Sequence, residues 1–294
     1  MMCAMHPVPN SERWVQFDGR RTFVRVAGEL AGQAQEPAPL LALHGRPPSH
    51  EALEPLLRLA DIGRPVVLYD QQGCGRSDPR ADEVVATIDE FADELHAVRT
   101  ELGLDRVHLL GHSWGGVVAL TYALRQPPGL ASLTLASTYV SRARLEADGE
   151  RLVDALPHDV RDAIRQHEAA GTTDDPAYQA ADVFFFRRHI CRLEPLPDCL
   201  VRARMRPAIG AVDTEGWDVM ARLGEVAVPT LVTCGRHDFS TPTQARAIAA
   251  GIPRSELTVF EESAHYAHLE ETERYLAVLV AFLDGADSGV ASLT

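Results

Sequence analysis

The chain has 294 residues, of which 46% are apolar, enough to bury a large core as one domain or one domain with an insertion. Its net charge of −14 argues against nucleic acid and anionic membrane surfaces as partners, because both attract basic patches. No apolar run approaches the roughly 18 residues of a transmembrane helix, and the first residues lack a signal-peptide pattern. We therefore expect a cytoplasmic protein, with no membrane or nucleic-acid partner.

The cysteines are odd in number and scattered along the chain: Cys3, Cys74, Cys191, Cys199 and Cys234. Such a set does not predict a disulfide framework and fits a reducing compartment. Cys191 and Cys199 have only His189 nearby and no companion Cys pair to complete a zinc site. We expect two unpaired thiols there, and neither a metal nor another cofactor in the protein.

The first third of the chain has strand patterns followed by alternating strand and helix patterns. Asp18-Gly19 is a strong hairpin signal between two strand patterns, 14–17 and 22–26. Two nearly continuous apolar runs, 40–43 and 66–69, are typical of strands buried on both faces. The segment between these two runs has a helical pattern.

The clearest helix spans 87–102, where Thr87 and Glu90 form a capping box and Gly103 ends the apolar repeat. Strand and helix patterns continue to alternate after it, with one long break. The remaining predicted strands are 107–110, 132–135, 230–233 and 256–260, and the remaining predicted helices are 117–124, 244–250 and 275–283. This alternation predicts a mostly parallel, doubly wound sheet.

The alternation breaks at 140–224, a charged stretch with helical more than strand patterning. We interpret this segment as a helical cap domain inserted into a core domain formed by 1–139 and 225–294. The last residues, 286–294, are predicted to be a disordered tail. The fold class is therefore α/β, with a helical cap over the carboxyl end of the sheet.

Gly111-His112-Ser113-Trp114-Gly115 matches the G-x-S-x-G pattern between a predicted strand and a predicted helix. This turn is so tight that small residues must flank the nucleophile, and the glycines supply them. The geometry lifts the serine hydroxyl above the sheet and directs the helix N-terminus toward developing negative charge. The motif therefore predicts Ser113 as a catalytic nucleophile.

Partners for Ser113 follow in the order that this type of hydrolase requires, acid and then base. Asp238 comes after the predicted strand 230–233, and His265 comes after 256–260. A neutral histidine can accept the serine proton near pH 7, and an aspartate behind it fixes its tautomer. We predict a Ser113–Asp238–His265 triad, with His268 as the alternative base. Structural roles are expected for three further histidines, His44, His112 and His237.

An oxyanion hole needs two backbone N–H groups, one from the residue after the nucleophile and one from the loop after the third strand. Trp114 supplies the first. In the loop, Pro47 and Pro48 cannot donate, so the candidates are Gly45 and Arg46, of which Arg46 is preferred.

Three segments, 44–47, 69–77 and 111–116, resemble those of the proline iminopeptidase family. The resemblance covers the whole chain and is weakest in the cap. It implies a capped α/β-hydrolase fold, hydrolysis of an N-terminal aminoacyl amide, and carboxylates that hold the substrate's free amino group. The resemblance also extends to amide hydrolases that remove a protecting aminoacyl group from macrolactam-antibiotic intermediates.

The sequence departs from the family pattern where that pattern binds the substrate. Arg46 and Pro48 replace two glycines of the first loop, and Phe239 replaces a Glu that often follows the triad acid. The late cap, at 207–210, has no match for a second amine-binding Glu. Glu215 and, after it, Asp213 are the candidates for an amine-binding carboxylate.

Phe239 and the run 184–186 favour a bulky hydrophobic acceptor on the substrate. The expected partner is therefore a small molecule or short peptide with a free amino group, cleaved through an acyl-enzyme. An esterase, lactonase or carbon–carbon bond hydrolase on the same triad is the alternative, and a non-catalytic binding module is a third. The oligomeric state stays open.

Overall fold

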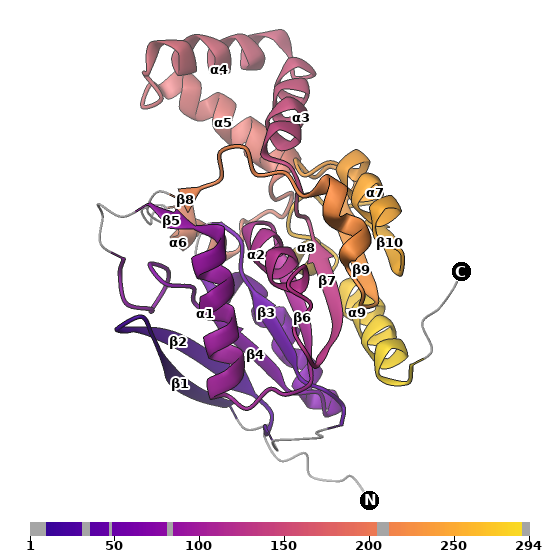
Figure 1. The fold of residues 1–294 in the computed structure, drawn as a ribbon. Coiled ribbons are helices and arrows are strands. Elements are labelled where there is room, and N and C mark those ends of the chain that lie inside the picture. The colour runs from indigo at the N-terminus through magenta and orange to yellow at the C-terminus, as the bar shows by residue number, and fades with distance from the viewer. Residues whose placement is uncertain (1–9, 31–35, 47–48, 81–84, 205–211, 290–294) are drawn as a thin grey trace, which may run out of the picture.

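The computed structural model describes residues 10–30, 36–46, 49–80, 85–204 and 212–289. Its centre is an eight-stranded sheet (Figure 1). In spatial order the strands are β1 (Asn10–Phe17), β2 (Arg20–Ala27), β4 (Val66–Tyr69), β3 (Leu40–Leu43), β6 (Val107–His112), β7 (Leu130–Ala136), β9 (Thr230–Gly235) and β10 (Ser255–Phe260).

The strands of this sheet are antiparallel only at the amino-terminal side. β1 pairs with β2, and β2 with β4, in antiparallel register. Asp18 and Gly19 turn the first hairpin with φ values of 50° and 71°, the positive pair that a tight two-residue loop needs. Every other neighbouring pair is parallel. The predicted mostly parallel sheet is confirmed.

Helices cover both faces of the sheet, and the alternation of side chains along the strands separates two apolar cores. Leu41 and Leu43 of β3 pack with α1 (Ile88–Glu101), α2 (Trp114–Ala123) and α7 (Pro242–Gly251). Leu40 and Ala42 point to the other face and pack with the 3-10 helix η1 (His50–Ile62) and with α9 (Thr272–Asp287). The sheet is doubly wound, as the sequence predicted.

Local signals place most element ends correctly. The predicted capping box is present, since Thr87 Oγ1 accepts from the Glu90 N–H and the Glu90 carboxylate accepts from the Thr87 N–H at 2.6 Å. The prediction of a tail that begins at residue 286 is wrong at its start, because α9 continues to Asp287. Residues 290–294 lie outside the described part.

Between β7 and β9 the chain leaves the sheet for a helical insertion, residues 137–229, within which the predicted cap 140–224 falls. It contains α3 (Arg142–Asp154), α4 (His158–Ala170), α5 (Pro176–His189), α6 (Asp198–Arg204), β8 (Val212–Asp213) and the 3-10 helix η2 (Met220–Glu225). Figure 1 shows α3, α4 and α5 beyond one end of the sheet. These three helices share a small apolar cluster around Leu156, Ile164 and Ala181. The short β8 pairs with β5 (Ala86–Thr87).

Candidate active site

Ser113 sits in the sharp turn between β6 and α2. Its φ of 53° and ψ of −118° lie in a region that residues other than glycine rarely adopt, which marks a strained backbone. The turn is also tightly packed, since a Cβ on Gly111 would lie 2.3 Å from the carbonyl oxygen of Gly115. The Ser113 N–H donates to the carbonyl of Ala136 at 2.8 Å. The expected elbow geometry is therefore present around this serine.

Asp238 and His265 come from the carboxyl ends of two adjacent parallel strands, β9 and β10. Their side chains are joined by a hydrogen bond of 2.8 Å from His265 Nδ1 to Asp238 Oδ1. Both residues are buried. The Asp238 carboxylate also accepts from the N–H of Ser240 at 2.8 Å, which fixes its orientation. With Nδ1 donating to the carboxylate, the Nε2 of His265 is left as a proton acceptor.

A cluster of histidine rings connects the loop that carries His265 to the turn that carries Ser113. The ring of His112, the residue before Ser113, lies 4.7 Å from that of His265 between centroids. His112 Nε2 also donates to the carbonyl of His265 at 2.9 Å. The ring of His268 lies 4.8 Å from His112, and burial lowers the pKa of His268 to about 3. Because such a group is a weak base and Asp238 bonds to His265, the geometry favours His265 over His268.

The loop after β3 lies directly against the nucleophile. A Cβ on Gly45 would be only 2.7 Å from the Cβ of Ser113, so only glycine fits there. The next residue, Arg46, has its carbonyl held by the Tyr266 hydroxyl at 3.3 Å. The backbone of the predicted oxyanion loop is thus adjacent to the Ser113 side chain. Pro47 and Pro48 lie outside the described residues.

Gln71, fully buried in the segment after β4, joins the two halves of the predicted oxyanion hole. Its amide nitrogen donates to the carbonyl of His44 at 2.8 Å, and its amide oxygen accepts from the Trp114 indole at 3.0 Å. The Gln71 N–H donates to His44 Nε2 at 3.1 Å, while His44 Nδ1 donates to the carbonyl of Gly45 at 2.8 Å. Burial lowers the pKa of His44, which keeps the ring neutral in this tautomer.

A structural role for His44 is predicted from the sequence, whereas a role for Gln71 is not. The only sequence signal for Gln71 is its place in the 69–77 motif. A glutamine that bridges two chain segments leaves no periodic pattern, so the sequence alone does not reveal its partners.

The end of α5 in the helical insertion contacts the loops that carry Asp238 and His265. The carbonyl of His189 accepts from the N–H of Phe239 at 3.2 Å, and His189 Nδ1 donates to the carbonyl of His237 at 2.9 Å. The carbonyl of Ile190 accepts from the N–H of His265 at 3.0 Å. The insertion is therefore bonded to both loops, which the sequence did not indicate.

The predicted apolar residues of the site divide into separate groups. Phe239 packs against His265, the predicted base, with the two ring centroids 4.5 Å apart. Phe185 belongs to the apolar cluster of the insertion, Phe186 packs near Cys191, and Phe184 is 39% exposed. Consecutive residues on a helix are about 100° apart, so three of them cannot share one face. The three rings of the run 184–186 therefore point in different directions, and the bulky hydrophobic acceptor inferred from them and from Phe239 stays a prediction.

The two candidate amine-binding carboxylates are exposed and lie in and after β8. The N–H of Glu215 donates to the carboxylate of Asp213 at 3.1 Å. Within the described residues, no hydrogen bond or ion pair joins either carboxylate to Ser113 or to His265. The 207–210 segment lies outside the described part of the chain.

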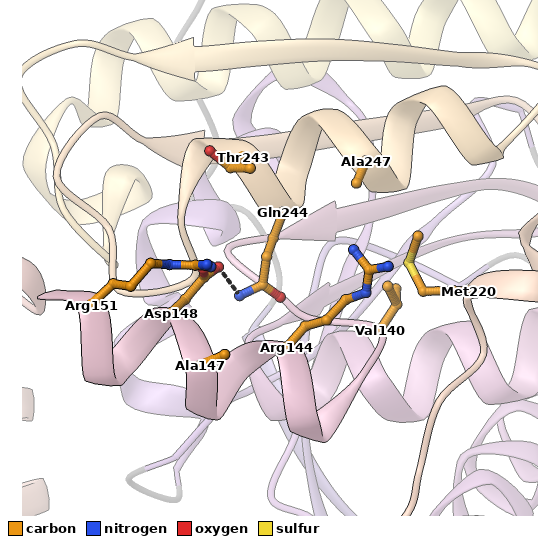
Figure 2. A pocket seen from close by; sticks show the side chains of 9 residues that line it. All are labelled: Val140, Arg144, Ala147, Asp148, Arg151, Met220, Thr243, Gln244 and Ala247. Atoms are coloured by element: carbon orange, nitrogen blue, oxygen red, sulfur yellow. Dashed lines mark hydrogen bonds and ion pairs between the residues drawn. The ribbon is translucent and has the colours of Figure 1, made fainter.

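A cavity of about 210 Å³ lies between α3 and α7, where the insertion meets the core. Figure 2 shows Gln244 of α7 reaching the buried carboxylate of Asp148 in α3, a hydrogen bond of 2.7 Å. Thr241, the N-cap of α7, donates to the same carboxylate at 2.8 Å. This cluster is a second polar attachment of the insertion, three residues from Asp238 along the chain.

Among the described residues, no group of three or more His, Cys, Asp or Glu side chains is arranged to hold a metal ion. Cys191 and Cys199 are both free thiols. None of the helices in the described part is both long and apolar enough to cross a membrane.

Comparisons with known proteins agree on the fold and the family. Residues 38–272 match the model of the alpha/beta hydrolase fold family. A proline iminopeptidase of Heyndrickxia coagulans is 37% identical over 290 residues, which cover 93% of this chain and 99% of that protein. The crystal structure of a Mycobacterium smegmatis proline iminopeptidase is 36% identical with a TM-score of 0.85, covering 95% of this chain and 99% of the other. The structure of VinJ is 33% identical with a TM-score of 0.85, covering 95% and 100%.

The doubly wound sheet and the family match define an α/β hydrolase. Within this class the chain belongs to the proline iminopeptidase family and is a serine hydrolase.

Proposed function

We propose that this enzyme removes an N-terminal aminoacyl group from an amide through a Ser113–Asp238–His265 triad. The observation that carries the proposal is the buried 2.8 Å bond from His265 Nδ1 to Asp238, on loops that follow adjacent strands. The strained elbow of Ser113 and the ring contact between His112 and His265 support it. Relatives named proline iminopeptidases, similar over almost the whole chain, point to the aminoacyl side of the reaction.

In this mechanism, His265 Nε2 accepts the proton of the Ser113 hydroxyl as its oxygen attacks the carbonyl carbon of the amide. The N–H groups of Trp114 and Arg46 stabilise the negative oxygen of the tetrahedral intermediate. The imidazolium then gives its proton to the leaving amine, and the C–N bond breaks. Water, deprotonated by the same histidine, releases the amino acid from the acyl-enzyme.

The substrate in this proposal is a short peptide or a hydrophobic aminoacylated small molecule with a free amino group. A protonated amine withdrawn from water requires an anionic partner. With Phe239 packed on His265, that partner must come from elsewhere, and Glu215 is the first candidate and Asp213 the second. Aminoacylated macrolactam intermediates of antibiotic biosynthesis are one substrate of this class. We place the enzyme in the cytoplasm, which its free thiols fit.

The test uses Ser113→Ala and three substrate types on the purified protein. The native enzyme should cleave aminoacyl arylamides, should cleave their N-acylated forms far less, and should be labelled by a fluorophosphonate. Ser113→Ala should lose both labelling and a factor on the order of 10⁴ in kcat, with an unchanged thermal midpoint. A variant that retained a tenth of the activity would exclude Ser113 as the nucleophile.

Ester or lactone hydrolysis on the same triad is the alternative, favoured by the apolar ring of Phe239 over the base. Labelling of Ser113 together with rapid cleavage of simple esters, and none of aminoacyl arylamides, would assign the enzyme to this class instead.

A further inference from the structure

Arg46 places a cation beside Trp114, the residue that follows Ser113. Its neighbour Gly45 packs on the Cβ of Ser113, so the backbone of Arg46 lies one residue from that contact. The guanidinium carbon lies 5.3 Å from the ring centroid of Trp114, the residue that follows the nucleophile. Gln71 fixes that indole through its Nε1–H. The charge is therefore oriented by a ring that is itself held in place.

This guanidinium has no ion pair and no side-chain hydrogen bond within the part of the chain that the structure describes. Neighbouring arginines differ, since Arg142 pairs with Glu146 at 2.7 Å and Arg76 with Glu12 at 2.7 Å. An arginine side chain stays protonated at any ordinary pH. Arg46 is thus an uncompensated positive charge at the site.

The ionisable groups that act on Arg46 are Cys74, Tyr139 and Arg142. Burial raises the pKa of the Cys74 thiol well above its usual value and also raises the pKa of Tyr139. Both groups are therefore neutral near pH 7, and Arg142 is positive. None of these three neighbours carries a negative charge that could neutralise the guanidinium, although the protein as a whole has a net charge of −14.

We propose that Arg46 binds a carboxylate on the leaving-amine part of the substrate. This inference rests on the proposed aminoacyl hydrolysis and narrows its substrate class. The acyl part of such a substrate carries a protonated amine, which a guanidinium repels, so Arg46 must face the other side of the scissile bond. A planar guanidinium matches a carboxylate with two parallel hydrogen bonds.

The substrates that fit are aminoacyl derivatives of an amine that also bears a carboxylate. Dipeptides with a free C-terminus are the simplest members. A larger aminoacylated acid presents the same carboxylate. Comparing kcat/KM for a dipeptide and for such an acid shows which of the two substrate types the enzyme prefers.

The experiment compares one dipeptide as the free acid and as the C-terminal amide, using the aminoacyl residue that the enzyme prefers in arylamides. The native enzyme should favour the acid by roughly five- to tenfold in kcat/KM, the range for a partly exposed charge-assisted contact. Arg46→Gln should bring this ratio close to one, and Arg46→Lys should fall between. The ratio cancels any effect of the substitution on the oxyanion loop, because both substrates use the same loop.

Arg144→Gln is the matched control. Arg144 is also an exposed arginine, and within the described residues its side chain likewise has no ion pair or hydrogen bond. It lies at the cavity between α3 and α7 (Figure 2). Its variant should keep the native acid-to-amide ratio. A ratio of one in the native enzyme, or the native ratio in Arg46→Gln, would overturn the role of Arg46.

The failures of the two proposals are distinguishable. Cleavage of aminoacyl arylamides without a preference for the free acid removes only the Arg46 inference. No cleavage of any aminoacyl amide, with Ser113 labelled and esters hydrolysed, removes both.

Discussion

The carboxyl edge of the sheet, where the proposed triad lies, and the helical insertion are fixed in different ways. At the edge, the turn at Ser113 and the loop at Gly45 touch so closely that single atoms decide which residue fits. In α3, α4 and α5 only four side chains are buried, namely Asp148, Ile164, Ala181 and His189. Two of these four are polar, and both of them hydrogen-bond to the chain that follows β9.

This difference shows how the insertion is joined to the rest of the molecule. Helices α3, α4 and α5 share only a small apolar cluster, and beside the apolar packing of Cys191 and Leu200 on Tyr266 the insertion is attached to the core by specific polar groups. Those groups lie on either side of Asp238, since His189 bonds to His237 and Asp148 bonds to Thr241. The carboxyl edge is thus held by close packing around Ser113 and Gly45, whereas α3, α4 and α5 are held to the core by a few attachment points.

Among the variants that distinguish these two regions, Asp238→Asn should have the largest effect on kcat. The amide would accept poorly from His265 Nδ1 and favour the wrong tautomer, so kcat should fall by about 10⁴ while the fold persists. Steady-state kinetics on an aminoacyl arylamide measure the loss, and the thermal midpoint reports the fold.

His265→Ala and His268→Ala are the companion variants. The first should match the loss of Asp238→Asn, and the second should keep most of the activity. Equal losses from both histidine variants would contradict the assignment of the base.

Glu94, a buried carboxyl group of the core, provides a test that measures protein stability instead of reaction rate. It lies in α1, accepts from Thr22 Oγ1 at 2.6 Å and from the N–H of Gln72 at 3.0 Å, and burial raises its pKa to about 7. Between its ordinary pKa of 4.5 and about 7, the folded state holds a proton that the unfolded chain has released. The free energy of unfolding should therefore fall as the pH rises through this window, by up to about 3 kcal/mol from this group.

Urea unfolding at pH 5 and at pH 8 measures this contribution. Glu94→Gln should lose less stability than the native protein over the interval, and Glu101→Gln, at an exposed position of the same helix, should behave like the native protein. Parallel curves for native protein and Glu94→Gln would show that Glu94 does not titrate in this window.

The fold was predictable from sequence because its signals are local. Apolar runs such as 40–43, the Asp18-Gly19 turn and the Thr87 capping box each determine their own element. The site residues that follow strands could be placed by the same reasoning. What the sequence did not indicate depends on contacts between distant segments, such as Gln71 with Trp114 or His189 with the acid loop. A single buried amide or imidazole has no periodicity, so its partners emerge only when the chain is folded.

Substitutions of two buried glutamines, one in each region, allow a direct comparison of the regions. We expect the smallest effect on rate from these variants. Gln71 bridges His44 and Trp114 at the nucleophile, while Gln244 bridges α7 to Asp148 of the insertion. Replacing either by Met keeps the volume but leaves buried polar groups unpaired, so each variant should lose about 1–3 kcal/mol of stability. Only Gln71→Met should loosen the oxyanion loop and lower kcat, by roughly tenfold to a hundredfold, with a small change in KM.

The measurement is kcat for hydrolysis of an aminoacyl arylamide, at a temperature where both variants are folded. The expected pattern is similar thermal midpoints for the two variants and a fall in kcat for Gln71→Met alone. If Gln244→Met lowered kcat as much, the insertion would control the oxyanion geometry through α7, and the separation of the two regions would be wrong. Equal, native kcat in both variants would instead show that Gly45 and the turn at Ser113 hold the loop without Gln71, because their close contact survives the substitution.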